Sequence, residues 1–218
     1  GFNRISWNLK SESNNTISEE NINKDISGNL VRPGIYYVQL YKQIKGQFTA
    51  LSKKIDFKIK PLHKPISNDN YTNSVNFWEE VDLVRDNINN LSNKIKKTKN
   101  KINLNLKAYE KAKLIDSELH SKLIDIRDKI LILEQKMNGS KSRSEIGEKN
   151  DFPTVWNYLW AAYGSSRSTY GPTKTHKESL QNASTIYKEL NSEIDVIIKL
   201  LQPIENNLNR IKSPKIRY

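Results

Sequence analysis

A seven-residue repeat of apolar side chains constrains this chain more than any other feature. Between Val81 and Met137, most positions reached by alternating steps of three and four residues are apolar or aromatic. This spacing gathers the side chains on one side of a helix, where a partner helix must cover them. A second series runs from Leu180 to Ile211 with no polar member. Together they predict long amphipathic helices packed as an antiparallel bundle.

The first series has a weak stretch. Asn105 and Asp116 replace apolar residues at two of its positions. A compact bundle requires a turn in a helix this long, so we expect a break near 107–115, with Asp116 marking it. Gly139 is suited to ending the second helix, because glycine adopts the backbone conformation found just past a helix terminus.

Proline and threonine punctuate the rest of the helical part. Phe152-Pro153-Thr154 predicts the start of a short helix over about 153–164. Pro172-Thr173 predicts the start of the last helix, with Thr175 and Glu178 spaced as a capping box. Pro203 lies inside that helix and is expected to kink it near 199–201, because proline lacks the backbone donor.

The N-terminal part has the two-residue period of strands. Ile5, Trp7 and Leu9 alternate with polar residues, residues 10–30 are polar and predict a long loop, and 35–41 is rich in β-branched and aromatic residues. Gly46 predicts a turn, and residues 55–59 alternate apolar and polar side chains. Three strands form a weak sheet with open edges, so self-association through an edge is one expectation.

Composition excludes several classes of function. The 218 residues include no cysteine and three widely separated histidines, which disfavours disulfides, thiolate sites and histidine-rich metal sites. No apolar run is long enough to span a membrane. The formal charge is +12, and the densest group of lysines lies at 94–113. Nucleic acid or an anionic surface is one explanation, but these lysines spread around the polar side of a helix, so a solvated face is favoured.

No reactive constellation emerges from the sequence. A glycosidase requires two carboxyl groups about 5–10 Å apart. Glu79 and Glu80 point apart on a helix, and Glu189 and Glu193 flank an apolar series as solvated residues would. Phosphate-binding glycine loops and HExxH are absent from the sequence. His120 and His176 each stand among charged neighbours and are expected at the surface. We therefore predict no catalytic, metal or cofactor residues.

Aromatic residues between 156 and 170 form the most distinctive cluster. Flat aromatic faces bind sugars and peptides, so one interpretation is a stacking surface. The alternative is that Trp156, Trp160 and Tyr163 share the core-facing side of the short helix, which their helical spacing favours. Tyr158 then lies off that side and is the better exposed contact. The candidate contact residues are Tyr158, Trp160 and Tyr170.

Two N-terminal motifs resemble a known family. Asn3-Arg4 followed by Trp7 and Leu9 resembles an N-R-x-x-W-x-L signature, and residues 33–40, Pro-Gly-Ile-Tyr-Tyr-Val-Gln-Leu, resemble its P-G-x-Y-x-V-x-L partner. Together they are similar to the C-terminal region of secreted bacterial proteins that carry a sortilin-like, BNR-repeat β-propeller. The resemblance implies an Ig-like sandwich followed by a helical region, and places any glycosyl hydrolase activity in the propeller.

These observations predict an α+β fold that is mainly α. We expect part of an antiparallel Ig-like sandwich at 1–62 and a long-helix bundle at 74–213. Gly1-Phe2-Asn3-Arg4 does not resemble a native start, so we expect a fragment whose compartment, secreted, periplasmic or cell-surface, follows from the resemblance. The predicted function is a non-catalytic structural or interaction module whose partner is its own upstream propeller or another protein. The alternatives are binding of nucleic acid or an anionic surface, and carbohydrate binding through residues 156–170.

Overall fold

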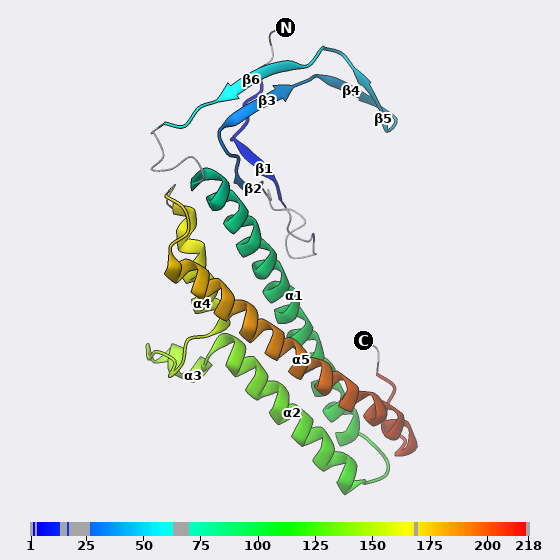
Figure 1. Ribbon diagram of the computed structural model, residues 1–218. Coiled ribbons are helices and arrows are strands. Elements are labelled where there is room, and N and C mark those ends of the chain that lie inside the picture. The colour runs from blue at the N-terminus through cyan, green and yellow to red at the C-terminus, as the bar shows by residue number, and fades with distance from the viewer. Residues whose placement is uncertain are drawn as a thin grey trace. The chain divides into compact units, whose positions relative to one another are not determined.

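The computed structural model describes residues 2, 4–13, 17, 27–62, 70–167 and 170–216. The fold is α+β and mainly helical, as predicted, with small antiparallel sheets followed by long helices (Figure 1). The chain divides into two compact units. One comprises residues 1–80 with 165–173, and the other comprises 81–164 with 174–218.

The second unit is a helical bundle. Its helices are α1 from Val81 onward, α2, the short α3 and α4, and α5. Their bounds are α1 Asn70–Glu110, α2 Ser117–Asn138, α3 Lys141–Glu145, α4 Val155–Tyr163 and α5 Lys174–Arg210. Figure 1 shows α2 running opposite to both α1 and α5. Ion pairs join α2 to both neighbours: Lys136 Nζ on α2 lies 2.8 Å from Glu193 Oε1 on α5, and Lys99 Nζ on α1 lies 2.5 Å from Glu134 Oε2 on α2.

The apolar series form the core, as predicted. All six residues that the repeat placed on α2 are buried, and on α5 the predicted residues are buried except Tyr187, which is half-buried. Removing such side chains from water is the main stabilising contribution in a bundle, at roughly 1.5–3 kcal/mol for each large one. The buried α2 residues are Leu119, Leu123, Ile126, Ile130, Leu133 and Met137.

The predicted break between the first two long helices is confirmed. Helix α1 ends at Glu110 and α2 begins at Ser117. Asp116 is the N-cap of α2, and its Oδ1 accepts a hydrogen bond of 2.9 Å from the Leu119 amide. The polar residue in the repeat therefore satisfies a helix terminus rather than interrupting a continuous core. Gly139 follows the last residue of α2 at φ +84°, also as predicted.

Two predictions, one for α4 and one for α5, are wrong. On α4 the buried side chains are Val155, Leu159 and Ala162, whereas Trp160 is 61% exposed. The core-facing side is thus rotated from the predicted one: Trp160 faces water, and Trp156 and Tyr163 are half-buried. Helix α5 begins at Lys174, so Thr175 lies inside its first turn and cannot be an N-cap. The helix continues through Pro203.

The strands differ more from expectation. Among the described residues, six short strands form three antiparallel pairs, β1–β2, β3–β6 and β4–β5. Residues 5–9 form no strand, and Leu9 at their end has a φ of +61°, outside the extended region. The predicted polar loop lies largely outside the described residues, but its ends are β1 and β2. The bounds are β1 Lys10–Glu12, β2 Ser27–Leu30, β3 Gly34–Val38, β4 Tyr41–Ile44, β5 Gln47–Ala50 and β6 Ile55–Ile59.

Residues 34–59 form one antiparallel hairpin, which we call the β-ribbon. Strand β3 pairs with β6, and β4 pairs with β5. Between the two pairs, the Leu51 amide donates to the Leu40 carbonyl at 2.8 Å. The hairpin reverses at Lys45 and Gly46, whose φ values are +48° and +81°. Such a two-residue turn with both φ values positive matches the twist of paired strands, and it confirms the turn predicted at Gly46.

Candidate functional site: the exposed β-ribbon

The predicted aromatic contacts do not assemble into one stacking surface on α4. Trp160 is exposed, and its ring meets Tyr163 edge-on at 5.8 Å. Tyr158 is only half-buried rather than exposed. Tyr170 is 68% exposed but belongs to the other compact unit. Trp156 is half-buried, and its Nε1 donates to Asn138 Oδ1 at 3.2 Å. Within α4, one exposed indole is available to a ligand.

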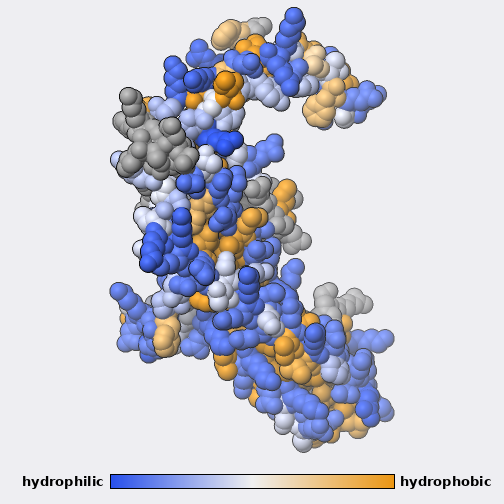
Figure 2. Space-filling model, viewed as in Figure 1, coloured by the Kyte–Doolittle hydropathy of each residue, from blue (hydrophilic) through white to orange (hydrophobic). Residues whose placement is uncertain are grey.

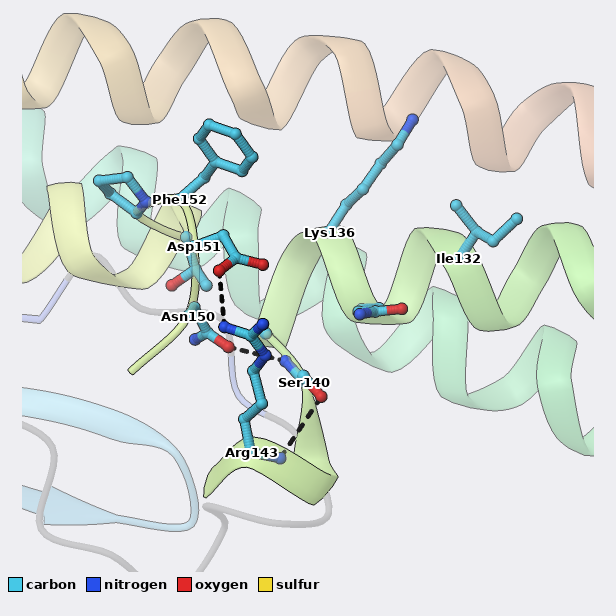
Figure 3. Close-up of a pocket in the computed structure, with 11 residues that line it drawn as sticks. Ile132, Lys136, Ser140, Arg143, Asn150, Asp151 and Phe152 are labelled. Carbon is cyan, nitrogen blue, oxygen red and sulfur yellow. Dashed lines mark hydrogen bonds and ion pairs between the residues drawn. The ribbon is translucent and has the colours of Figure 1, made fainter. Parts of the chain in front are cut away.

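A pocket of ≈ 300 Å³ lies where the loop after α2 leads into α4 (Figure 3). Its polar groups are used by the loop itself. Arg143 Nη1 lies 2.6 Å from Asp151 Oδ1, and the Ser140 amide donates to Asn150 Oδ1 at 2.8 Å. Lys136 at its edge pairs with Glu193. Each cation that lines the pocket is thus neutralised, and Asp151 is the one acidic lining residue. This arrangement closes a loop, and it lacks the second carboxyl group that sugar hydrolysis requires.

The remaining candidate chemical groups are scattered. Within the described parts of the chain, three or more metal-ligating side chains do not gather anywhere. His120 is exposed and stacks on Tyr109 with ring centres 5.0 Å apart. Glu193, expected to be solvated, is partly exposed and bonded to Lys136. These groups stabilise neighbouring helices rather than facing a common point.

The lysine-rich stretch of α1 is largely paired with acids. Lys94 lies 2.7 Å from Asp195, and Lys101 lies 2.6 Å from Glu205, both on α5. Lys99 pairs with Glu134 on α2, and Lys107 with Glu110. Partly exposed pairs of this kind contribute little to stability, about 0–1 kcal/mol each. Their importance here is that they reduce the positive charge available for a polyanion along this helix.

The β-ribbon is the most unusual surface of the molecule. No described residue before position 63 is buried. Large apolar side chains of the β-ribbon nevertheless lie in water, and Figure 2 shows apolar and polar residues mingled over these strands. So many large apolar side chains exposed on one short segment are typical of an interaction site. The exposed fractions are Ile35 76%, Tyr37 58%, Val38 56%, Leu40 54%, Tyr41 51%, Ile44 54%, Phe48 68%, Leu51 57% and Ile55 61%.

The two faces of the β3–β6 pair differ in chemistry. Tyr36 lies opposite Phe57, and Val38 opposite Ile55, so these four side chains share one face. The indole of Trp7 meets Tyr36 and Phe57 at 5.8 and 6.1 Å between ring centres and covers part of this face. We call it the aromatic face.

The other face, which we call the lysine face, is mixed. Ile35 lies opposite Lys58, and Tyr37 lies opposite Asp56. Lys54 Nζ is held 4.1 Å from the centre of the Tyr37 ring. This cation–π contact fixes one positive charge over the sheet. The described parts of the chain provide no acidic partner for Lys58 or Lys60.

The open edges of the sheet were predicted from the sequence, but the full extent of the exposed surface was not. The available signal was composition: half of the β-ribbon residues are apolar or aromatic, while only β6 alternates cleanly.

None of the described helices contains the long apolar stretch that a membrane-spanning segment requires. No family model matches the chain, and neither a curated protein nor a solved structure matches it.

Proposed function

We propose that this chain is a non-catalytic protein-interaction module. Its β-ribbon is the docking surface, and its helical bundle is a self-contained support. The proposal depends on one observation: the β-ribbon has only two strands side by side, and its large apolar side chains are exposed to water. Hairpins of two strands are marginally stable alone and acquire stability by packing against further strands or helices. A partner that covers the β-ribbon would supply that packing.

The partner is proposed to be a protein, either a domain upstream of this chain or a separate molecule. The two N-terminal motifs support the first, because they resemble the Ig-like region that follows a sortilin-like, BNR-repeat propeller in secreted bacterial proteins. On this proposal the β-ribbon is part of such a sandwich, and the protein is secreted, periplasmic or displayed at the cell surface. The reading frame upstream of Gly1 tests this origin. Propeller repeats and a signal peptide would support it, and an unrelated upstream domain would contradict it.

Nucleic acid is the main alternative, and the formal charge of +12 favours it. The ion pairs of α1 argue against it, since Lys94, Lys99 and Lys101 already contact acids of neighbouring helices. Titrating the chain with a fluorescent 30-base-pair duplex at several salt concentrations separates the two functions. We expect affinity weaker than micromolar at physiological salt. Sub-micromolar binding with a steep salt dependence would overturn the proposal, because phosphate contacts release counterions.

Carbohydrate binding is a weaker alternative, which depends on the exposed Trp160 ring. A glycan array with the native chain and with Trp160→Ala tests it. We expect no signal that depends on Trp160. A specific glycan whose binding the substitution abolishes would favour a lectin-like module instead.

A further inference from the structure

We infer that the β-ribbon recognises an extended polypeptide strand of a partner protein, whose side chains alternate between apolar and acidic, added along the free edge of β6. The inference rests on the proposed function and names the chemistry of the partner. It follows from the pairing of β6, from its alternation and from its charge.

The free edge comes from the topology. Strand β6 pairs with β3 alone among the described strands. In an antiparallel pair, alternate residues direct their backbone N–H and C=O groups away from the partner strand. The outer edge of β6 therefore presents a row of donors and acceptors, which an added strand can satisfy.

The alternation of apolar and polar residues in β6 determines which side chains of the added strand are apolar. Ile55, Phe57 and Ile59 lie on the aromatic face, which Trp7 covers only in part. An incoming strand would extend this face with apolar side chains. Side chains on neighbouring strands lie about 4.5–5.5 Å apart, so apolar residues beside Ile55 and Phe57 would shield both from water.

Charge determines the other half of the pattern. Lys58 lies on the lysine face, and Lys54 and Lys60 continue the same alternation before and after the strand. Acidic side chains opposite these lysines would form cross-strand pairs. Asp56 lies between them, so the residue opposite Asp56 is expected to be neutral or basic. On the lysine face, the favoured strand therefore has acidic side chains opposite the lysines and a neutral side chain opposite Asp56.

Charge also excludes a second copy as the favoured occupant. The β-ribbon contains five lysines and one acidic residue, and Lys60 follows it directly. Pairing two β6 edges would bring two strands of net positive charge together, and edge lysines are a common device against such self-pairing. An acidic strand from another protein meets the same edge with opposite charge.

The test uses the whole 218-residue chain and synthetic nine-residue peptides. The probe peptide alternates glutamate with valine, beginning and ending with glutamate. Threonine replaces the glutamate at its central position, which lies opposite Asp56. Its controls are a valine–lysine peptide, a valine–threonine peptide, and a glutamate peptide in which two prolines prevent strand pairing. Binding is measured by fluorescence anisotropy, and hydrogen exchange locates the amides that become protected.

We expect the valine–glutamate peptide to bind best and to slow exchange at residues 55–59. The variant Lys58→Glu/Lys60→Glu should weaken its binding about fivefold or more and should strengthen binding of the valine–lysine peptide. Lys129→Glu, at an exposed lysine on α2, is the matched control and should change neither. Circular dichroism verifies that each variant is folded.

Other outcomes overturn the inference in distinguishable ways. If the proline-containing peptide binds equally well, strand pairing is not needed and the chain recognises negative charge alone. A nucleic acid or an anionic membrane would then bind in the same way. Equal binding of the valine–threonine peptide would remove the acidic preference and leave the proposed interaction module intact. Absence of binding by every peptide, together with concentration-dependent dimers that protect residues 55–59, would assign the edge to a second copy.

Discussion

Gly139 illustrates how one residue determines the geometry after α2. Its φ of +84° and ψ of −179° lie in a region that side-chain-bearing residues avoid. A Cβ at this position would come within 2.1 Å of Asn150 Nδ2. Asn150 cannot simply turn away, because its Oδ1 accepts the hydrogen bond of the Ser140 amide. The helix end and the loop that closes the pocket thus depend on the same glycine.

We expect Gly139→Ala to lower the free energy of unfolding by about 1–3 kcal/mol from backbone strain, with the clash against Asn150 adding to it. The measurement is urea denaturation followed by circular dichroism. Gly147→Ala is the control, since Gly147 also has a positive φ, +76°, but open space around its Cβ position. Equal losses in the two variants would show that the contact with Asn150 has no energetic role.

At the scale of one element, α4 provides a test of which side faces the core. Leu159 is 2% exposed, while its neighbour Trp160 is 61% exposed. Leu159→Ala should cost about 2–5 kcal/mol through lost burial and the cavity left behind. Trp160→Ala should cost less than about 1 kcal/mol, although it removes more atoms. Thermal or urea unfolding compares the two, and a larger loss for Trp160→Ala would restore the predicted orientation.

The long helices could be predicted from the sequence because burial repeats along them. A residue such as Ile130 or Ile194 is fully buried, and its neighbours three or four positions away share that environment. Apolar residues therefore recur at this spacing in the sequence. Helix α4 has apolar residues on every side, and Asn157 is its one strongly polar residue. Nine such residues predict a helix but do not indicate which side is buried.

The strands were harder to predict for the opposite reason. No side of β4 or β5 is buried, so their side chains need not alternate, and β5 was missed. Strand β6 was predicted because Ile55, Phe57 and Ile59 alternate with polar residues, and β3 was predicted from the β-branched and aromatic residues of 35–41. Their pairing was not predicted. Contact through Tyr158, Trp160 and Tyr170 stays a prediction. The sequence does not indicate which surface the rest of the chain leaves exposed, because exposure depends on how the other elements pack.

At the scale of the whole molecule, the two units differ in how their apolar side chains are used. In the bundle, Leu123, Ile130 and Ile194 are fully buried. In the β-ribbon, residues of similar hydrophobicity remain in water, so few contacts oppose local opening. Amide exchange follows such differences, because regions with little buried apolar surface open at low free energy.

Native-state hydrogen exchange on the isolated chain should therefore give different amide exchange rates for the β-ribbon and for the helical bundle. We expect amides of 34–59 to exchange within seconds to minutes and those near Ile130 and Ile194 to approach the protection of global unfolding. Repeating the measurement at a tenfold higher concentration controls for self-association. Equally slow exchange in both regions at low concentration would mean that the β-ribbon is already covered. If instead it exchanges rapidly alone and slowly with a bound strand, its stability derives from the partner, which is the behaviour required of a docking surface.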